Sequence, residues 1–307
     1  MWADLQKHWR EGGVLTRLIL LNLGVFVVVA TLRLLGRLGV IPGSGEGVTG
    51  GGVLGLAVSW DGEVLKVRPW SVITHMFVHT DVWHVALNML LLWWMGRLFA
   101  ATLGNRKLLS TYLLGGLAGC AGYIVMFNLF PGLRSGSLFA YGASASVMAV
   151  FAAVATREPD RPIGILFLGP VALKWVALVY VALDYFGLSS GGPNAGGHLA
   201  HLGGAAYGFF LIRALDRGRD PGRWLEALLD RLAVWTRMGS SSGPRMRFVS
   251  RKRTAPATRR TVSDEEFNAS KREKAAELDR ILDKISRQGY DQLTAEEKRF
   301  LFEQSHR

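Results

Sequence analysis

The sequence is dominated by apolar segments of about the length of a membrane-spanning helix. A bilayer core requires roughly 20 apolar residues per helix. Six segments reach or approach this length, at residues 14–36, 83–103, 108–130, 138–156, 171–188 and 196–214. We therefore expect an all-α, polytopic membrane protein with six transmembrane helices, which places both chain termini on the same side of the membrane.

The composition agrees with a membrane protein that has basic ends, because half of the residues are hydrophobic and the net charge is +12. The single cysteine, Cys120, excludes an intrachain disulfide and any cysteine-based metal site. Lys7 and Arg10 precede the first apolar run, as in a signal peptide, but Arg33 interrupts its end and no cleavage site of small residues follows. An uncleaved anchor is therefore favoured.

Basic residues in the short loops predict the orientation. Arg106 and Lys107 follow the second span, Arg157 follows the fourth, and a cluster of arginines begins at Arg213 after the sixth. By the positive-inside rule these loops and both termini are cytoplasmic. Lys174 lies near the start of the fifth span and is expected to extend to the same surface.

The distribution of apolar and charged residues suggests four parts. We expect a cytoplasmic N-terminal segment at 1–13, a six-helix membrane domain at 14–219, an amphipathic and basic linker at 220–262, and a C-terminal helical hairpin at 263–307.

A few polar residues lie inside the predicted spans, where they are costly. Such residues are functional candidates, although serines and histidines also form hydrogen bonds that only join helices. The candidates are His84, Asn88, Ser144, Ser146, His198 and His201.

Three of these candidates are expected at one depth. Spans two, four and six all run inward from the outer face, so His84, Ser144 and His201 each lie near the outer end of a span. Asn88 is four residues from His84 and shares its helix face. A serine, a histidine and a pair of hydrogen-bond donors could act as nucleophile, general base and oxyanion stabilisers in acyl transfer.

The two serines of the fourth span cannot both face His201, because residues two apart point about 200° apart around a helix. Ser144 follows Gly142 and Ala143 at the helix start, where free N–H groups could stabilise an oxyanion. We therefore predict Ser144 as the nucleophile and Ser146 as a helix-packing hydroxyl.

Small residues around these candidates allow close helix contact. Gly204 and Gly208 follow His201 on roughly the same face, and Ala145 and Ala149 offer a matching face on the fourth span. Close contact is required for a direct hydrogen bond between a serine and a histidine, although this spacing is common in membrane helices of every function.

These residues resemble the motifs of the rhomboid intramembrane serine proteases. HMFVHTDVWHVALN resembles the signature of the family's second span, Gly142-Ala143-Ser144 resembles its G-x-S element, and the residues from Ala200 to Gly208 resemble its A-H-x-x-G-x-x-x-G element. The resemblance covers residues 14–215 and implies a bacterial inner-membrane endopeptidase.

The resemblance also implies the roles of the site residues. Ser144 and His201 would form a catalytic dyad, and His84, Asn88 and the Ser144 backbone N–H would form the oxyanion hole. Gly142, Gly204 and Gly208 would serve helix packing. No cofactor or metal is implied, and the expected substrates are proteins with a single transmembrane helix, cleaved near the outer membrane face.

The sequence departs from the family pattern at two places. Ala145 follows the serine where the commonest form has glycine, and the first outer loop lacks the Trp-Arg pair that many members carry. His75 and His79 are interpreted as structural or water-positioning residues. His198 is interpreted as polar lining or a loop contact, and Asp184 as a carboxylate at the membrane interface.

Two other classes of function are weighed against a protease. A catalytically inactive rhomboid-like protein would bind membrane helices without cleaving them, but such proteins typically lack the serine or the histidine, and this chain has both. A transporter or channel is disfavoured because the sequence shows no internal repeat or pair of broken helices.

The first two parts of the tail are interpreted as membrane contacts. The leucines and tryptophans of residues 220–237 have helical spacing, which predicts an amphipathic helix on the cytoplasmic membrane surface. Residues 245–260 carry seven basic residues and no acidic one, and anionic lipids are a nearer partner for them than nucleic acid.

The last part of the tail, 263–305, predicts a helical hairpin. Ser263 with Glu266 and Thr294 with Glu297 each fit a capping box, and Gly289 lies between the two helices. Two helices in about 40 residues bury little surface, so we expect the hairpin to dock on a partner, on a second copy or on the membrane domain. The alternative is a solvated, marginally helical tail.

Overall fold

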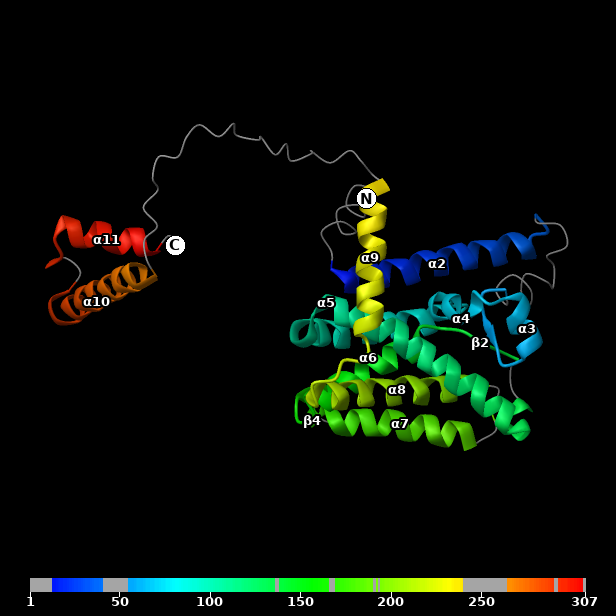
Figure 1. The fold of residues 1–307 in the computed structure, drawn as a ribbon. Helices are drawn as coiled ribbons and strands as arrows, with labels where there is room; N and C mark the ends of the chain where they lie inside the picture. Colours follow the sequence, from blue (N-terminus) through cyan, green and yellow to red (C-terminus); the bar gives the residue numbers. More distant parts are fainter. Residues whose placement is uncertain are drawn as a thin grey trace. The chain divides into compact units, whose positions relative to one another are not determined.

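The computed structural model shows a mostly helical chain (Figure 1). It describes residues 13–40, 55–135, 138–165, 169–189, 192, 194–239, 264–289 and 292–305. The N-terminal segment 1–12 and the basic run 245–260 lie outside these residues. Contacts divide the chain into two units, Met1–Ser241 and Ser242–Arg307, which are described separately below.

In the described residues, the body of the first unit is built from five helices, and a further long helix, α9 (Arg223–Gly239), follows them. The five helices of the body are α2 (Val14–Arg37), α5 (Val82–Leu129), α6 (Ser144–Arg157), α7 (Leu173–Ser189) and α8 (Ala195–Asp216). Short helical pieces lie between α2 and α5 and after α5, at α3 (Gly62–Val67), α4 (Ser71–Thr74), η2 (His75–Phe77) and η3 (Pro131–Ser135).

A glycine divides the longest helix into two. Gly104 has φ 84° and ψ 164°, which is non-helical and lies in a region that glycine enters without steric cost. The 48 residues of α5 are therefore two helices joined at Gly104, and the predicted second and third spans correspond to its two halves.

Two helices in the described part of the chain are long and apolar enough to cross a membrane, Val14–Arg37 and Val82–Leu129. The six-helix bundle predicted from the sequence is not confirmed by this criterion. Two helices are too short, since α6 has 14 residues and α7 has 17. The 22 residues of α8 are long enough but do not meet the apolar criterion, and α5 counts as one helix although Gly104 divides it. About 20 residues are needed for a full span.

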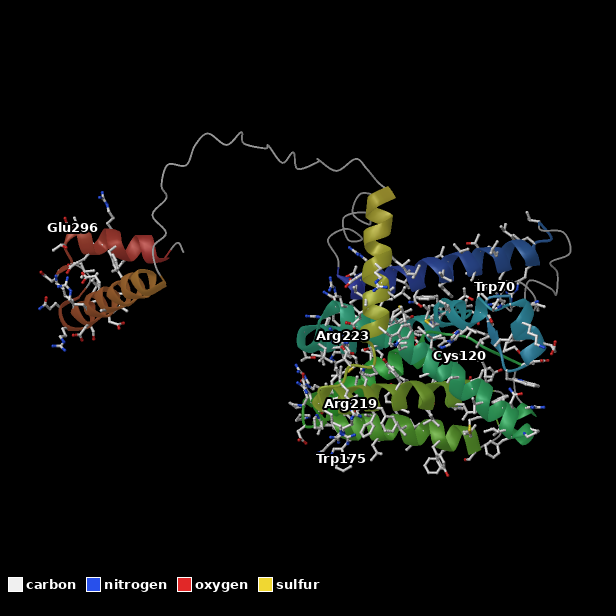
Figure 2. The ribbon with its side chains drawn as sticks, in the orientation of Figure 1. Trp70, Cys120, Trp175, Arg219, Arg223 and Glu296 are labelled. Carbon is white, nitrogen blue, oxygen red and sulfur yellow. The ribbon has the colours of Figure 1, made fainter. Side chains whose placement is uncertain are left out.

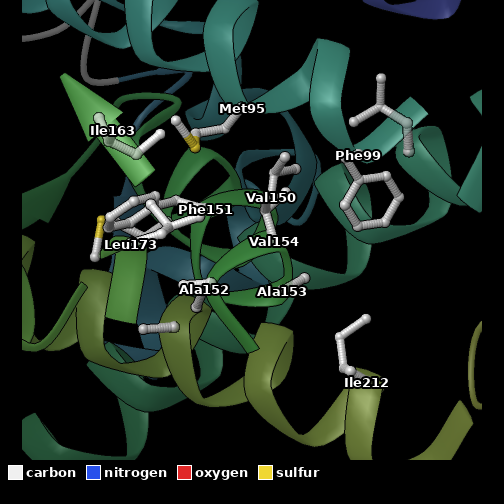
Figure 3. Packing of buried hydrophobic residues seen from close by; sticks show 14 residues of the cluster. Met95, Phe99, Val150, Phe151, Ala152, Ala153, Val154, Ile163, Leu173 and Ile212 are labelled. Atoms are coloured by element: carbon white, nitrogen blue, oxygen red, sulfur yellow. The ribbon is translucent and has the colours of Figure 1, made fainter. Parts of the chain in front are cut away.

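Helix α6 lies at the centre of this unit, in contact with α5, α7 and α8. Every residue from Ala145 to Ala155 is buried. The largest apolar cluster joins α6 to α5, α7, α8 and the β3 strand, and Figure 3 shows Phe151 and Val154 of α6 among Met95, Leu173 and Ile212.

Small residues bring the helices around α6 unusually close. A Cβ atom on Gly115 of α5 would lie 2.2 Å from the Cβ of Ala149. A Cβ atom on Gly208 of α8 would lie 2.1 Å from the carbonyl oxygen of Ala149. These contacts leave no room for a side chain at either glycine.

Two short antiparallel sheets occur that the sequence did not predict. β1 (Val58–Ser59) pairs with β2 (Phe139–Ala140), and β3 (Pro162–Ile165) pairs with β4 (Gly169–Ala172). The predicted fourth span began at residue 138, but α6 begins at Ser144, because residues 139–140 hydrogen-bond to the loop after α2 instead.

A buried polar network joins α2, α5 and η2. The Tyr112 hydroxyl donates to the carbonyl oxygen of Met76 at 3.0 Å, and Asn22 donates to Tyr112 at 3.1 Å. Both side chains are fully buried. The network satisfies polar groups that would otherwise be costly inside an apolar core.

The outer surface of the long helices is apolar. Large exposed side chains occur on α2, α5, α7 and α8, among them Val27, Leu87, Leu183 and Phe210. In Figure 2, Trp175 of α7 lies at the edge of the helical body, whereas Cys120 is buried within it. An apolar exterior of this extent is expected for a protein surrounded by lipid.

Helix α9 (Arg223–Gly239) follows α8, and polar contacts attach its first turns to α5. Lys107 forms ion pairs of 2.5 Å with both Asp220 and Glu226, and Ser110 donates to Glu226 at 2.8 Å. The predicted helix at 220–237 is thus present, and Trp224, Leu228 and Leu232 are exposed on it.

The second unit contains α10 (Asp264–Gln288) and α11 (Ala295–Ser305). The capping box at Thr294 and Glu297 is confirmed: the Thr294 N–H donates to Glu297 at 2.7 Å, and the Glu297 N–H donates to Thr294 at 3.3 Å. Gly289 has a positive φ of 83° directly after α10. Ser263, the first residue of the other predicted box, lies outside the described residues.

Candidate functional site

Ser144 is the first residue of α6 and is partly exposed. The first N–H groups of a helix have no partner within it, and the helix dipole favours negative charge there. Ser144 therefore combines a hydroxyl with N–H groups that could hold an oxyanion.

The backbone before Ser144 is held by two histidines. The Gly142 N–H donates to the carbonyl oxygen of His75 at 2.9 Å, and the Ala143 N–H donates to Nε2 of His79 at 3.2 Å. Gly142 has φ 126°, a conformation that strains residues with a side chain. The His79 side chain thus helps to fix the turn that presents Ser144. His75 instead contributes its backbone carbonyl, and its ring contacts the carbonyl oxygen of Ser71.

His79 can accept this hydrogen bond only when its Nε2 is unprotonated. Burial lowers the pKa of His79 from 6.5 to about 4, and the nearby charge of His84 lowers it further in the same direction. The imidazole is therefore neutral near pH 7, and the turn before Ser144 keeps its hydrogen bond.

His84 and Asn88 lie in the first turns of α5. Asp81 caps this helix by accepting from the His84 N–H at 2.8 Å, and Asn88 Nδ2 donates to the His84 carbonyl oxygen at 2.8 Å. The His84 Nε2 and the Ser144 Oγ both lie within 4 Å of the point where a Cβ of Gly142 would be. The structure thus brings His84 beside Ser144, whereas Asn88 uses one amide hydrogen within its own helix.

His201 lies in the second turn of α8, three residues before Gly204. A Cβ atom on Gly204 would lie 2.1 Å from the carbonyl oxygen of Ala145, so the helix turns that carry His201 and Ser144 are adjacent. His201 is also close enough to His84 for electrostatic interaction. Within the described contacts, however, no hydrogen bond joins Ser144 to His201.

Asp184 corrects a prediction made from the sequence. It was interpreted as an interfacial carboxylate, but only 6% of its surface is exposed. One of its oxygens, Oδ1, lies 2.9 Å from His201 Nδ1 and 2.8 Å from His198 Nδ1. His198 is likewise more than polar lining, because it shares this carboxylate with His201.

Asp184, His198 and His201 are the one group in the described residues whose ligand atoms could together hold a metal ion, since these atoms lie within 4.8 Å of one another. Two ligands of a tetrahedral zinc ion, with bonds of about 2.0–2.1 Å, lie roughly 3.3 Å apart. The observed spacings of 2.8 and 2.9 Å fit hydrogen bonds better.

Ser146 lies away from these groups. Its hydroxyl is fully buried and has no hydrogen-bond partner in the part of the chain that the structure describes, and it faces Gly116 of α5, where a Cβ would lie 2.5 Å from the Ser146 oxygen. This position agrees with a helix-packing role.

Residues 66–217, which include this cluster, match the family model described as Rhomboid domain. The chain therefore contains a rhomboid domain, and the resemblance found in the sequence is confirmed over this range. Residues 261–307 match a second model, a family of unknown function named DUF6576.

Individual relatives carry the same domain. The chain is 35% identical over 162 residues to presenilin-associated rhomboid-like protein A, mitochondrial, of Danio rerio. The aligned region covers 51% of this chain and 41% of the relative. The chain is also 30% identical over 167 residues to rhomboid protein 1, mitochondrial, of Saccharomyces cerevisiae, and this aligned region covers 50% of the chain and 46% of the relative. The chain thus spans less than half the length of these relatives.

The relatives contradict the predicted location. The sequence was interpreted as that of a bacterial inner-membrane protein with cytoplasmic termini, but these relatives, and the human protein that is 31% identical over 163 residues, are all mitochondrial. The positive-inside rule orients a chain relative to a membrane but does not identify the membrane. The basic loops therefore could not distinguish a bacterial from a mitochondrial inner membrane.

Proposed function

We propose that this chain is an intramembrane serine endopeptidase in which Ser144 is the nucleophile and His201 the general base. The observation that supports this most strongly is the close approach of α8 to α6 at Gly204 and Ala145. Neither side chain is long, so a direct proton transfer requires helix backbones as close as these.

The proposed chemistry gives each of these groups one role. His201 takes the proton of the Ser144 hydroxyl as Oγ bonds to the carbonyl carbon of the substrate, and later gives that proton to the amine that leaves. The negative charge on the substrate oxygen is stabilised by the Ser144 N–H, His84 and the free amide hydrogen of Asn88. Water then attacks the ester carbonyl while His201 takes its proton, and His201 gives that proton to Ser144 Oγ as the bond to the second product breaks.

The membrane arrangement is part of the proposal. We assign six spans to α2, the two halves of α5 on either side of Gly104, α6, α7 and α8. Ser144 and His201 both lie at helix starts, so this assignment places them near one membrane face, where water can reach the acyl-enzyme. The substrates would be proteins with a transmembrane helix that unwinds at this depth.

The domain limits are proposed from the same pattern. We assign 14–219 to the protease domain, 220–262 to a linker and 263–307 to the hairpin, with 1–13 before the first span. The hairpin is proposed to bind a protein partner or a second copy of itself, and the basic linker to bind anionic lipids.

The proposal is tested with the purified full chain in lipid nanodiscs and a reporter protein with one transmembrane helix. We expect Ser144→Ala and His201→Ala to abolish cleavage, and Ser146→Ala to retain most of it. A fluorophosphonate probe should label the wild type and not Ser144→Ala. Cleavage by Ser144→Ala at the wild-type rate would contradict the proposal, and a folded wild type that neither cleaves nor reacts would favour a protein that binds membrane helices without cleaving them.

A further inference from the structure

Asp184 is a buried carboxylate on α7 for which the Ser144–His201 chemistry alone requires no role. It lies near the end of α7, opposite the first turns of α8, where His198 and His201 are three residues apart. Its Oδ1 atom contacts Nδ1 of both histidines, at 2.8 and 2.9 Å. A carboxylate in an apolar helix is costly unless it is paired, so its place at this site calls for a function.

The geometry selects one tautomer of His201. An ionised carboxylate can only accept hydrogen bonds, so a histidine nitrogen in contact with it must carry a proton. Nδ1 of His201 is therefore the protonated nitrogen in the neutral ring. Nε2 is then left with the free electron pair, which is the condition for accepting the proton of a serine hydroxyl.

We propose that Asp184 is a positioning residue, which holds His201 with Nδ1 protonated and Nε2 available to Ser144. The inference rests on the proposed function, and it adds a third group to the Ser-His pair. When Ser144 attacks, its proton moves to His201 Nε2 and the ring becomes an imidazolium. Asp184 stays ionised and stabilises that charge, and the proton leaves again with the amine.

His198 supports the carboxylate and does not compete for the proton of Ser144. It donates to the same Oδ1 from α8, and its ring packs against α7, where a Cβ on Gly187 would lie 2.5 Å from His198 Nε2. Asp184 therefore has two partners: His198 fixes the position of the carboxylate, and the carboxylate orients His201. We expect loss of His198 to retain the Asp184–His201 hydrogen bond, because that bond has its own donor.

The first experiment measures the tautomer directly, without any substrate. Histidine is labelled with ¹⁵N in the full chain in nanodiscs, and the His201 signals are assigned by their loss in His201→Gln. We expect the wild type to show a protonated Nδ1 and an unprotonated Nε2, and Asp184→Asn to shift a measurable fraction of His201 to the opposite tautomer. An unchanged His201 spectrum in folded Asp184→Asn would overturn the inference.

The second experiment measures reactivity, with Asp160→Asn as a matched control. Asp160 lies in the turn before β3, is exposed, and pairs with Lys174 at the start of α7, so its loss removes an α7-bound carboxylate at the end of the helix away from Asp184. For Asp184→Asn we expect kcat and the rate of fluorophosphonate labelling to fall roughly 10²-fold or more with KM nearly unchanged. Asp160→Asn should match the wild type in kcat, KM and labelling rate. His198→Gln should lower kcat only a few-fold.

The outcomes separate this inference from the proposed function. If Asp184 only clamps α7 to α8, its replacement lowers the melting temperature or raises KM, while Ser144 labelling in the folded fraction keeps its rate. That result would overturn the positioning role. Loss of wild-type activity on treatment with a chelator, restored by Zn²⁺, would also overturn it in favour of a metal site. If the proposed function fails instead, the wild type does not react with the probe, but the tautomer measurement still decides the role of Asp184.

Discussion

Gly204 of α8 lies against the backbone of Ala145 of α6, so closely that a Cβ on Gly204 would be 2.1 Å from the Ala145 carbonyl oxygen. Backbone cannot move aside as the end of a flexible side chain can. The spacing of these two helices is therefore set by the absence of a single methyl group, one turn from His201.

Replacement of this glycine tests that relationship. We expect Gly204→Ala to lower the free energy of unfolding by at least about 1–3 kcal/mol, because a methyl group must push two packed helices apart. Gly24→Ala in α2 is the matched control, since nothing lies within 4 Å of its Cβ position. Thermal or denaturant unfolding in the same detergent compares them. Equal destabilisation by both changes would show that the close contact has no energetic consequence.

Two tyrosines make a second matched pair. Tyr112→Phe removes the hydroxyl that bonds to Met76 and Asn22, and we expect a loss of about 1–3 kcal/mol because buried partners are left unsatisfied. The Tyr207 hydroxyl is buried without a hydrogen-bond partner among the described residues, so Tyr207→Phe should be neutral or stabilising. The melting temperatures of the two variants should therefore move apart, and a similar fall in both would exclude the network as the cause.

The contact between α5 and α9 predicts a difference between two neighbouring cations. Lys107 is mostly buried between Asp220 and Glu226, whereas Arg106 pairs with Asp230 at the surface. We expect Lys107→Gln to speed hydrogen exchange in residues 223–232, because two carboxylates lose their shared partner. Arg106→Gln should leave exchange nearly unchanged, since exposed pairs contribute about 0–1 kcal/mol. Equal exchange in both variants would show that Lys107 does not hold α9.

The α10–α11 hairpin should lose stability in acid. Hydrogen bonds from Lys284 and from the Thr294 N–H lower the pKa of Glu297 from 4.5 to about 2. A lowered pKa in the folded state adds stability above pH 4.5, and this is lost as the pH falls from 4.5 towards 2. Hydrogen exchange of residues 278–301 in the full chain should rise over this range once corrected for intrinsic rates. Glu297→Gln should remove most of the pH dependence, and an equal dependence in that variant would assign it to other groups.

The sequence predicts those features that depend on local pattern. The apolar segments indicated where the long helices lie, and the break between the second and third spans coincides with the non-helical backbone at Gly104. The start of α6 was placed too early, because residues 139–140 have an apolar character that suits either a helix or a strand. Only their pairing with Val58 and Ser59, more than 70 residues earlier, decides between the two.

Asp184 shows a different limit of prediction from sequence. No motif surrounds it, and its distance from His201 depends on how α7 and α8 pack. The available signal was its chemistry, since a carboxylate near the end of one apolar helix lies at about the depth of histidines at the start of the next. The family resemblance implied a dyad of Ser144 and His201, which assigns no role to a third residue.

The contact between Gly115 and Ala149 also limits the order in which this sequence can change. With Ala149 present, an alanine at 115 would meet its methyl group at 2.2 Å, but without that methyl the nearest atoms of α6 would lie at 3.7 and 3.8 Å, an ordinary contact. The pair can therefore change to alanine at 115 and glycine at 149 only if Ala149→Gly comes first. A lineage that acquires Gly115→Ala first has two methyl groups in collision until position 149 also changes. The two sequences pack equally well, but only one order of substitution connects them without that collision.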